Sequence, residues 1–281
     1  MSDGSVASAL RSQARLVVIE APAGCGKTFQ ACSYACDVAP NAGHGRVLVL
    51  THTHAAKNEF ASRTRARSSH IEARTIDSLI AQIGTVYHEA LDLPRDVMTW
   101  TRCQRDGYDE LAKRVAALLE GCRFVSRSLA RRYPIVVCDE HQDASPQQHS
   151  IVLSLLRAGA KLRVFGDPMQ DVFSNTSRTA TKADDQQWSI LKASADMFDK
   201  LTDGHRWKDS NPALGRWIFD ARARLESGHP VEISDDLPHG VSILWADNAS
   251  PRYGGFQLTR EDASPIYRAL RCPERLLVLS A

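Results

Sequence analysis

Residues 21–28 form a loop whose composition suits phosphate binding. The loop reads Ala21, Pro22, Ala23, Gly24, Cys25, Gly26, Lys27 and Thr28, between an apolar stretch and a helical pattern. Glycines let the backbone wrap closely around phosphate oxygens, and amide groups at a helix N-terminus attract anions. Lys27 can reach the β- and γ-phosphates of ATP, and the Thr28 hydroxyl can ligate Mg²⁺. We therefore predict a site for ATP and Mg²⁺; the alternative is a tight turn into a helix with an exposed lysine.

Two adjacent carboxylates follow the apolar run Ile135–Cys138. Asp139 is placed to hold Mg²⁺ through water, and Glu140 to orient and deprotonate the attacking water. The alternative is that acidic residues here cap the helix that begins near Pro146. Capping does not explain two acids at the very end of a strand, so we predict Asp139 as a metal ligand and Glu140 as the catalytic base.

A glutamine follows the apolar run Leu162–Phe165. The segment Gly166–Gln170 places Gln170 where its amide could sense the γ-phosphate by hydrogen bonding. On its own this segment is typical of a turn.

Four short apolar runs have the length and β-branched content of buried parallel strands. They are Leu16–Ile19, Val47–Leu50, Ile135–Cys138 and Leu162–Phe165. Helical patterns follow three of them, over Thr28–Val38, Ala55–Arg65 and Pro146–Leu156. Strand alternating with helix predicts an α/β fold, with a parallel sheet and helices on both faces. Ligands of such sheets bind at the carboxyl ends of the strands, where all of these motifs fall.

Composition excludes several classes of protein. The 281 residues are 43% apolar and 24% charged, as in ordinary globular proteins. No apolar run approaches the ~20 residues that a membrane helix needs. Residues 1–10 lack the basic start and apolar block of a signal peptide, so we expect a cytoplasmic protein with no membrane partner. Seven cysteines without a C-x-x-C pair argue against a disulfide framework or a zinc site.

Charge and a few reactive side chains leave alternatives open. The net charge of +2 does not by itself indicate a nucleic-acid binder. Arginines form two clusters, which are either solvated faces or phosphate contacts: Arg63, Arg65, Arg67 and Arg74, and Arg123, Arg127, Arg131 and Arg132. Cys25 is either a packing residue or a reactive thiol at a helix N-terminus. His52, His54 and His141 could be metal ligands, but a polar strand end is favoured because a fourth ligand is not evident.

Taken in order from about Val17 to Arg216, these motifs resemble the superfamily 1 DNA helicases of the UvrD/Rep type. Three segments resemble the family's A-G-A-G-S-G-K-T, D-E-F-Q-D and G-D-x-x-Q-S-I-Y motifs: Ala21–Thr28, Asp139–Asp143 and Gly166–Gln170. Three others resemble its T-x-T-x-x-A, T-F-H-G/S-L and L-x-x-N-Y-R segments: Leu50–Ala56, Arg74–Leu79 and Leu201–Arg206. Their joint order is far more specific than any single motif.

The resemblance implies a RecA-like P-loop NTPase fold and a role for each matching residue. The implied catalytic residues are Lys27, Glu140, Gln170 and Arg206. Thr28 and Asp139 would hold the metal, and His205, beside Arg206 in the nucleotide site, replaces an aromatic that stacks on adenine. The implied contacts to single-stranded DNA are Thr51, His52, Thr75 and Phe173. His52 and Asp77 stand where the family has Phe and His.

The resemblance also predicts the domain organisation. We expect a RecA-like motor domain over residues 1–84 and 126–216, a small helical insertion over 85–125, and an incomplete second domain or extension over 217–281. Because the resemblance stops before the family's last motifs, we expect unwinding to need a second motor domain, from a missing C-terminal half or a protein partner. The alternatives are a DNA-binding regulatory protein that uses ATP without unwinding, and an RNA-directed superfamily 1 helicase.

Overall fold

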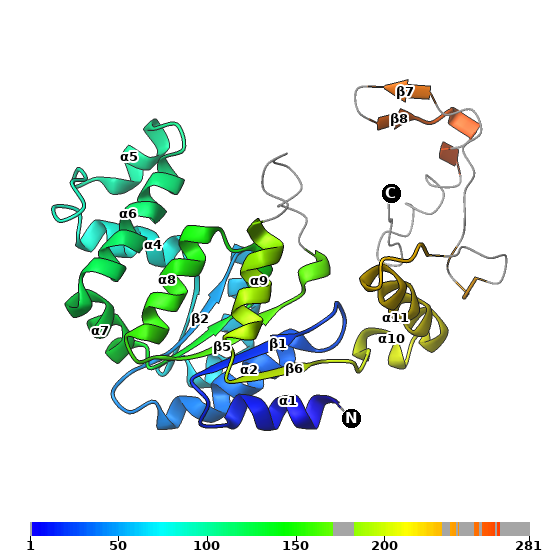
Figure 1. The fold of residues 1–281 in the computed structure, drawn as a ribbon, viewed down its shortest axis with the longest axis horizontal. Coiled ribbons are helices and arrows are strands. Elements are labelled where there is room, and N and C mark those ends of the chain that lie inside the picture. Colours follow the sequence, from blue (N-terminus) through cyan, green and yellow to red (C-terminus); the bar gives the residue numbers. More distant parts are fainter. Residues whose placement is uncertain are drawn as a thin grey trace. The chain divides into compact units, whose positions relative to one another are not determined.

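The computed structural model describes residues 2–170 and 183–231, and the short stretches 237–239, 241, 250–252, 255–261 and 263–264. The chain divides into two compact units, Met1–Arg206 and Trp207–Ala281. The first unit holds the predicted motifs (Figure 1). The finer division into a split motor domain with an insertion over residues 85–125 stays a prediction.

A six-stranded sheet forms the centre of the first unit. Its strands are β1 (Leu16–Glu20), β2 (Val47–Thr51), β3 (Ile71–Thr75), β4 (Ile135–Cys138), β5 (Lys161–Gly166) and β6 (Met197–Lys200). The strand order is β3-β2-β4-β5-β1-β6, and every neighbouring pair is parallel. The predicted parallel α/β fold is confirmed, and all carboxyl ends of the strands lie at one edge of the sheet.

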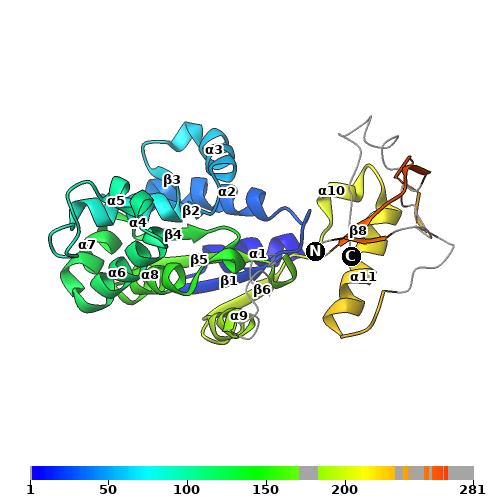
Figure 2. The ribbon, with the colours of Figure 1, turned by 90° about the horizontal axis from the view of Figure 1, so that it is seen from above.

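Helices cover both faces of this sheet. The helices of the first unit are α1 (Ser2–Arg11), α2 (Lys27–Val38), α3 (His54–Arg63), α4 (Ile76–Val86), α5 (Val97–Cys103), α6 (Gly107–Gly121), α7 (Arg123–Arg132), α8 (Pro146–Arg157) and α9 (Ala183–Ala193). In Figure 2, α2 and α3 lie on one side of the strands and α9 on the other. Alternate residues of β2 explain this: Leu48 and Leu50 join the core under α4, α6 and α8, whereas Val47 and Val49 face away from it.

The connection from β3 to β4 is helical and shares its core with the sheet. Leu111 and Val115 of α6 are buried in the same cluster as Val136 of β4 and Leu155 of α8. Gly84 of α4 touches α6 so closely that a Cβ there would lie 2.7 Å from Leu111 Cδ1. Helix α6 is therefore packed onto the six-stranded sheet and against α4.

A buried arginine fixes the N-terminal helix α1. Arg163 of β5 is fully buried and donates hydrogen bonds to the carbonyl oxygens of Leu10, Ser12 and Ala14 at the end of α1. Its guanidinium also lies 5.3 Å from the centre of the Tyr34 ring on α2. These contacts compensate the cost of burying the charge, and they hold the end of α1 beside β5 and α2.

The second unit begins within α10 (His205–Lys208). It contains α11 (Pro212–Glu226), which starts with the Asn211 side chain accepting a hydrogen bond from Leu214 N. Trp207 and Phe219 meet edge to face with ring centres 6.2 Å apart. Strands β7 (Ser250–Arg252) and β8 (Gly255–Gln257) form an antiparallel pair.

Candidate nucleotide-binding site

The loop between β1 and α2 has the geometry of an anion cradle. Gly24 and Gly26 adopt left-handed conformations, with φ of 77° and 82°, and α2 begins directly afterwards at Lys27. Residues with a Cβ are strained in that region, so the two glycines determine how the loop turns. The loop is anchored to β5, because Ala21 N donates to Gly166 O at 2.9 Å. Cys25 within it is fully buried, which favours packing over reactivity.

Lys27 and the two acids at the end of β4 come together, as the sequence predicts. The Lys27 side chain is 9% exposed, and its ammonium forms an ion pair with Glu140. Asp139 is 4% exposed, and Glu140 takes a left-handed backbone conformation with φ of 52°. A non-glycine residue in this conformation indicates backbone strain, which is often found at functional sites. The turn directs Glu140 to Lys27, and the Glu140 side chain stays partly exposed.

Asp139 carries an unsatisfied oxygen. Burial raises the pKa of Asp139 to about 6; the charge of Lys27 opposes the shift and that of Glu140 adds to it. Within the described part of the chain, Asp139 Oδ1 is buried without a hydrogen-bond partner. A buried carboxylate oxygen of this kind is costly unless a ligand completes it. The site therefore fits a cation, which carboxylate and hydroxyl oxygens such as those of Asp139 and Thr28 would hold.

Gln142 connects the ends of β4 and β5. Its Nε2 donates to Glu140 Oε2 at 2.9 Å, and its Oε1 accepts from Asp167 N at 3.0 Å. The Gln170 side chain in turn donates to Asp167 Oδ2 at 2.6 Å. Gln170 is thus linked to Glu140 through Asp167, by its side chain and its backbone N–H, and through the Gln142 side chain. The sequence analysis did not single out Gln142, although the D-E-x-Q-D pattern contains it.

His205 and Arg206 lie against the loop that contains Lys27. Arg206 N donates to Gly24 O at 3.1 Å. A Cβ on Gly26 would lie 3.1 Å from His205 Cδ2, and His205 Nε2 hydrogen-bonds Asp3 Oδ2 of α1 at 2.7 Å. Asp3 was not predicted, because nothing in the sequence relates residues so far apart.

The three described residues predicted to contact DNA line up along the ends of β2 and β3. Thr51 pairs with Thr75 in the sheet register, and both are buried. Their hydroxyls are used internally: Thr51 Oγ1 donates to Thr53 O at 3.2 Å, and Thr75 Oγ1 accepts from Ser78 N at 3.2 Å. His52 borders an open groove, and burial lowers its pKa although Asp77 and Glu140 oppose the shift. Phe173 lies outside the described residues.

The groove next to these strand ends is shared with the helical connection. His52, Asp77 and Ser78 line it from the sheet side, and Met98 and Tyr108 line it from α5 and α6. The Tyr108 side chain is 46% exposed, so an aromatic face is available at the rim. Aromatic rims beside polar groups suit the stacking of unpaired bases.

A family profile described as "AAA domain" matches residues 4–213, three quarters of the chain. The chain belongs to this AAA domain family. The match spans the loop, the acidic pair and the segment around His205, so it covers the whole candidate site.

Two relatives of the AAA domain come from mycobacteria. The RecBCD enzyme subunit RecB of Mycolicibacterium smegmatis is 32% identical over 130 residues, which are 46% of this chain and 11% of that protein. The ATP-dependent DNA helicase UvrD2 of Mycobacterium tuberculosis is 34% identical over 98 residues, which are 34% of this chain and 13% of that protein. The matched regions therefore span about a tenth of these relatives.

A solved structure is also similar. The crystal structure of Pif1 helicase from Candida albicans aligns with a TM-score of 0.44 and 16% identity, over 84% of this chain and 44% of that one. The predicted resemblance to the N-terminal motor domain of superfamily 1 helicases is confirmed by the family match and by the two mycobacterial relatives.

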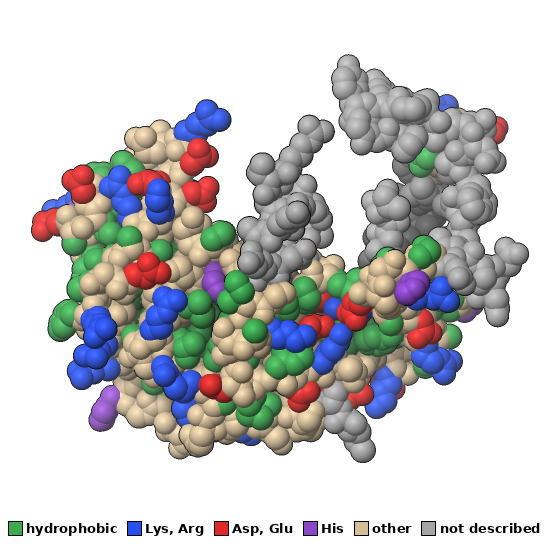
Figure 3. All heavy atoms as spheres, in the orientation of Figure 1, with side chains coloured by type: hydrophobic (Ala, Val, Ile, Leu, Met, Phe, Trp, Pro, Cys, Tyr) green, Lys and Arg blue, Asp and Glu red, His purple; other side chains and the backbone are tan. Residues whose placement is uncertain are grey.

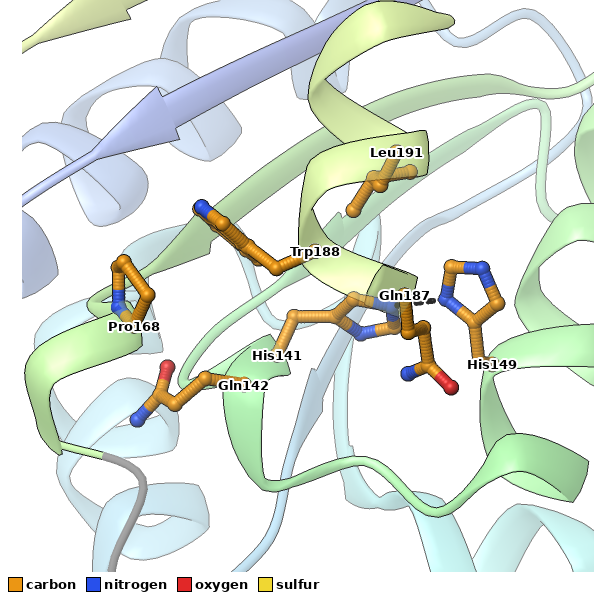
Figure 4. Close-up of a pocket in the computed structure, with 7 residues that line it drawn as sticks. All are labelled: His141, Gln142, His149, Pro168, Gln187, Trp188 and Leu191. Atoms are coloured by element: carbon orange, nitrogen blue, oxygen red, sulfur yellow. Dashed lines mark hydrogen bonds between the residues drawn. The ribbon is translucent and has the colours of Figure 1, made fainter. Parts of the chain in front are cut away.

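A histidine pair of the AAA domain lies behind the acidic turn. His141 Nε2 and His149 Nδ1 are 2.9 Å apart, and the rings point toward one another in a small pocket closed by Trp188 and Leu191 of α9 (Figure 4). Burial, assisted by the charges of His149 and His52, lowers the pKa of His141 to about 3. His141 is therefore neutral near pH 7 and supports the turn that carries Glu140.

The described residues of the AAA domain contain no group of three or more His, Cys, Asp or Glu side chains that could hold a metal ion. None of their helices is long and apolar enough to cross a membrane.

Proposed function

We propose that this AAA domain is the ATP-hydrolysing motor domain of a superfamily 1 helicase of the UvrD type that acts on single-stranded DNA. One observation carries the proposal. A buried lysine at the start of α2 meets two carboxylates at the end of β4, and one buried carboxylate oxygen lacks a hydrogen-bond partner in the described part of the chain. Buried charges gathered at the carboxyl edge of a parallel sheet are expected at a reaction site.

The residues of the loop fit ATP with Mg²⁺. Backbone amides over residues 21–28 would hold the phosphates, Lys27 would neutralise their charge, and Thr28 and Asp139 would hold the cation. Bound ATP would supply the phosphoanhydride bond that is broken, and a bound Mg²⁺ ion would supply positive charge to stabilise the phosphate oxygens. Every other element of the mechanism belongs to the chain itself.

The Lys27–Glu140 ion pair describes a resting state. Glu140 is occupied by Lys27 and by Gln142, so its carboxylate is not free to act on a water molecule. When phosphates take over Lys27, Glu140 loses its cation and becomes available as a general base. Gln142 keeps Glu140 tied to Asp167 during this exchange. In this proposal, the binding of nucleotide to Lys27 also releases Glu140 to act as the base.

Gln170 and Arg206 complete the proposed catalytic group. Gln170 lies at the end of the series of hydrogen bonds that starts at Glu140. We propose that its amide hydrogen-bonds the γ-phosphate, which would connect the phosphate to the end of β5. Arg206 is held to the loop through its backbone at Gly24. We assign Arg206 to the γ-phosphate and His205 to the nucleobase.

We assign single-stranded DNA to the groove beside the ends of β2 and β3. His52 and Tyr108 border it and offer ring faces for bases, and Phe173 is proposed to act with them. The hydroxyls of Thr51 and Thr75 are already used internally, so these residues would hold the rim in shape. DNA is preferred over RNA because the relative UvrD2 is named a DNA helicase.

We further propose that unwinding needs a second motor domain, and that the protein works in the cytoplasm. A single sheet gives a single grip on the strand, and translocation requires two parts that open and close in turn. The matched relatives are far longer than the matched region, so they have room for such a part. An arginine delivered across the cleft by the second domain would be worth ~10³–10⁵ in rate.

The test is ATP hydrolysis and strand displacement by the purified 281-residue chain with Mg²⁺. We expect slow turnover that single-stranded DNA stimulates more than RNA of the same sequence, and no displacement. Stronger stimulation by RNA would favour the RNA-directed alternative. Turnover that neither nucleic acid changes, together with tight DNA binding, would favour the regulatory alternative. Absence of both ATP binding and hydrolysis would contradict the proposal.

A further inference from the structure

Another pocket, separate from the groove and from the histidine pocket described above, lies between α6, α7 and α8. Its volume is ≈ 450 Å³, which is in the range of small-molecule sites. Arg123 and Arg127 of α7 and Arg157 of α8 line it, together with Ser154 and Glu120. In Figure 3, Lys and Arg side chains (blue) gather on the face over α7 and the neighbouring end of α8.

The pocket is far from the loop that binds nucleotide. Helix α8 starts near the carboxyl end of β4 and ends at Arg157, shortly before β5 begins. Its 12 residues span about 18 Å. Helix α7 likewise ends shortly before β4 begins. Arg157, and with it the pocket that it lines together with Arg123 and Arg127, therefore lies toward the amino edge of the sheet, and the proposed nucleotide site lies at the opposite edge.

Two of the arginines have no acidic partner within the described residues. Arg123 and Arg127 are one turn apart on α7, and both are exposed. Like charges at this spacing destabilise a helix. Arg123 also lies in the first turn of α7, which contains no acidic residue, and a positive charge there opposes the helix dipole. An anion in the pocket would relieve both unfavourable interactions.

A buried hydroxyl in the same pocket also lacks a hydrogen-bond partner among the described residues. Ser154 lines the pocket and is 3% exposed, yet its Oγ has no hydrogen-bond partner in the part of the chain that the structure describes. A serine inside a helix usually bonds the carbonyl four residues earlier. An unpaired buried hydroxyl lowers stability, and a ligand oxygen in the pocket would remove that cost.

The acidic residue in the pocket is already engaged. Glu120 Oε1 lies 3.8 Å from Arg157 Nη1 and accepts a hydrogen bond from Ser150 Oγ at 2.6 Å. Three arginines and one glutamate give the pocket a formal charge of about +2. A phosphate carries more charge and more acceptor oxygens than a carboxylate, so it matches this surplus better.

We propose that Arg123, Arg127 and Ser154 form a phosphate-binding site, separate from the ATP site, with Arg157 at its rim. The guanidinium groups hold the phosphate oxygens, and the Ser154 hydroxyl donates to one of them. The volume admits more than one phosphate. The phosphates belong either to a free diphosphate compound or to the backbone of a single-stranded nucleic acid.

Binding of two probes tests this site in a Lys27→Ala background, in which the nucleotide loop contributes little. The probes are inorganic pyrophosphate, followed by calorimetry, and a fluorescein-labelled single-stranded DNA, followed by anisotropy. At least one of the two probes should bind. Arg127→Gln should weaken the binding of that probe tenfold or more, since charge-assisted contacts are lost. The matched control is Arg131→Gln, one turn further along α7 and outside the pocket; it should change binding less than threefold.

Ser154→Ala adds a readout that a structural role would not give. This variant should leave the melting temperature of the ligand-free chain unchanged or higher, because an unpaired hydroxyl is removed. It should still lower the affinity for the probe that binds about threefold to tenfold. A response to pyrophosphate identifies a free phosphate compound, and a response to DNA alone identifies a nucleic-acid backbone. If neither probe binds, or if Arg127→Gln behaves like Arg131→Gln, the proposal is wrong. Because Lys27 is absent, this outcome is independent of whether the ATP site works.

Discussion

The two halves of the sheet's carboxyl edge differ in how their polar groups are satisfied. At the ends of β2 and β3, the hydroxyls of Thr51 and Thr75 are bonded to their own backbone. At the ends of β1 and β4, Lys27 is paired with the acid that we propose as the base, and Asp139 Oδ1 is buried without a partner among the described residues. At the ends of β2 and β3 these hydroxyls already have hydrogen-bond partners. At the ends of β1 and β4 a buried carboxylate oxygen has none, so a ligand could supply one.

This difference indicates where the free energy of ligand binding is used. A site with an unsatisfied buried group gains stability when a ligand arrives, whereas a satisfied rim offers only its exposed faces. The nucleotide half should therefore respond strongly to single substitutions, and the rim of the groove should respond weakly. The following four predictions test that contrast, from the largest expected effect to the smallest.

Glu140→Gln should lower ATP turnover by about 10²–10⁴-fold, because the general base is lost. ATP should bind at least as tightly as before, since glutamine no longer competes for Lys27. Phosphate release and calorimetry measure the two quantities. Glu110→Gln, at an exposed helical ion pair with Arg114, is the matched control and should leave both unchanged. Undiminished turnover in Glu140→Gln would remove this residue from the mechanism.

Lys27→Ala should weaken ATP binding about tenfold to a hundredfold, because a charge-assisted contact is worth roughly 1.5–3 kcal/mol. Calorimetry with Mg²⁺–ATP measures the change, and the exposed Lys113→Ala on α6 serves as the control. Equal affinities for the two variants would contradict the assignment of the loop.

Asp139 should make the chain sensitive to pH in a defined direction. Its pKa of about 6 in the folded chain lies above its ordinary value of 3.8, so the folded state holds a proton that the unfolded state lacks between these pH values. Without nucleotide, this group's contribution to stability falls by up to about 1.4 kcal/mol per unit as pH rises through that window. Mg²⁺-dependent ATP binding should show the opposite trend and strengthen as pH rises past about 6.

Asp139→Asn provides the check. It should remove both trends, abolish the Mg²⁺ dependence of ATP binding, and melt at the same or a higher temperature at pH 8 without nucleotide. Melting curves from pH 4 to pH 8 measure the first effect. A clear loss of thermal stability at pH 8 would show that the carboxylate has a stabilising partner, and the contrast between the two halves would fail.

Thr75→Ala should cost about 0.5–2 kcal/mol of stability, because the side chain caps α4. Thr53→Ala is the matched control, since Thr53 caps α3 in the same way. Both variants should keep their affinity for single-stranded DNA within about threefold of the original, measured by anisotropy well below their melting temperatures. If Thr75→Ala alone loses tenfold, its hydroxyl contacts DNA directly and the rim is not complete as it stands.

The central strands could be predicted from sequence, and the residues that we propose for the nucleotide site stand out there, because both leave local signals. β1, β2, β4 and β5 are apolar runs buried on both faces of the sheet, which is the pattern expected of central parallel strands. The edge strands β3 and β6 were missed. Glu72 and Arg74 alternate through β3, where Arg46 pairs with Glu72, and edge strands of this kind lack an apolar run.

Contacts between distant segments explain the other omissions. Helix α1 is weakly apolar overall and is held by Arg163, more than 140 residues away along the chain. Asp3 meets His205 only because α1 is held in this position. The unsatisfied Oδ1 of Asp139 could not be predicted either, since it depends on the packing around β4 rather than on the residue type.

A crystal structure of the chain with Mg²⁺ and a non-hydrolysable ATP analogue would test the central claim most directly. We expect the analogue's phosphates to lie on the backbone amides of residues 21–28 and the cation to lie beside Asp139. We also expect the Lys27 ammonium to contact the phosphates instead of Glu140. An analogue bound to this loop while the Lys27–Glu140 pair remains closed, or bound elsewhere on the chain, would contradict it.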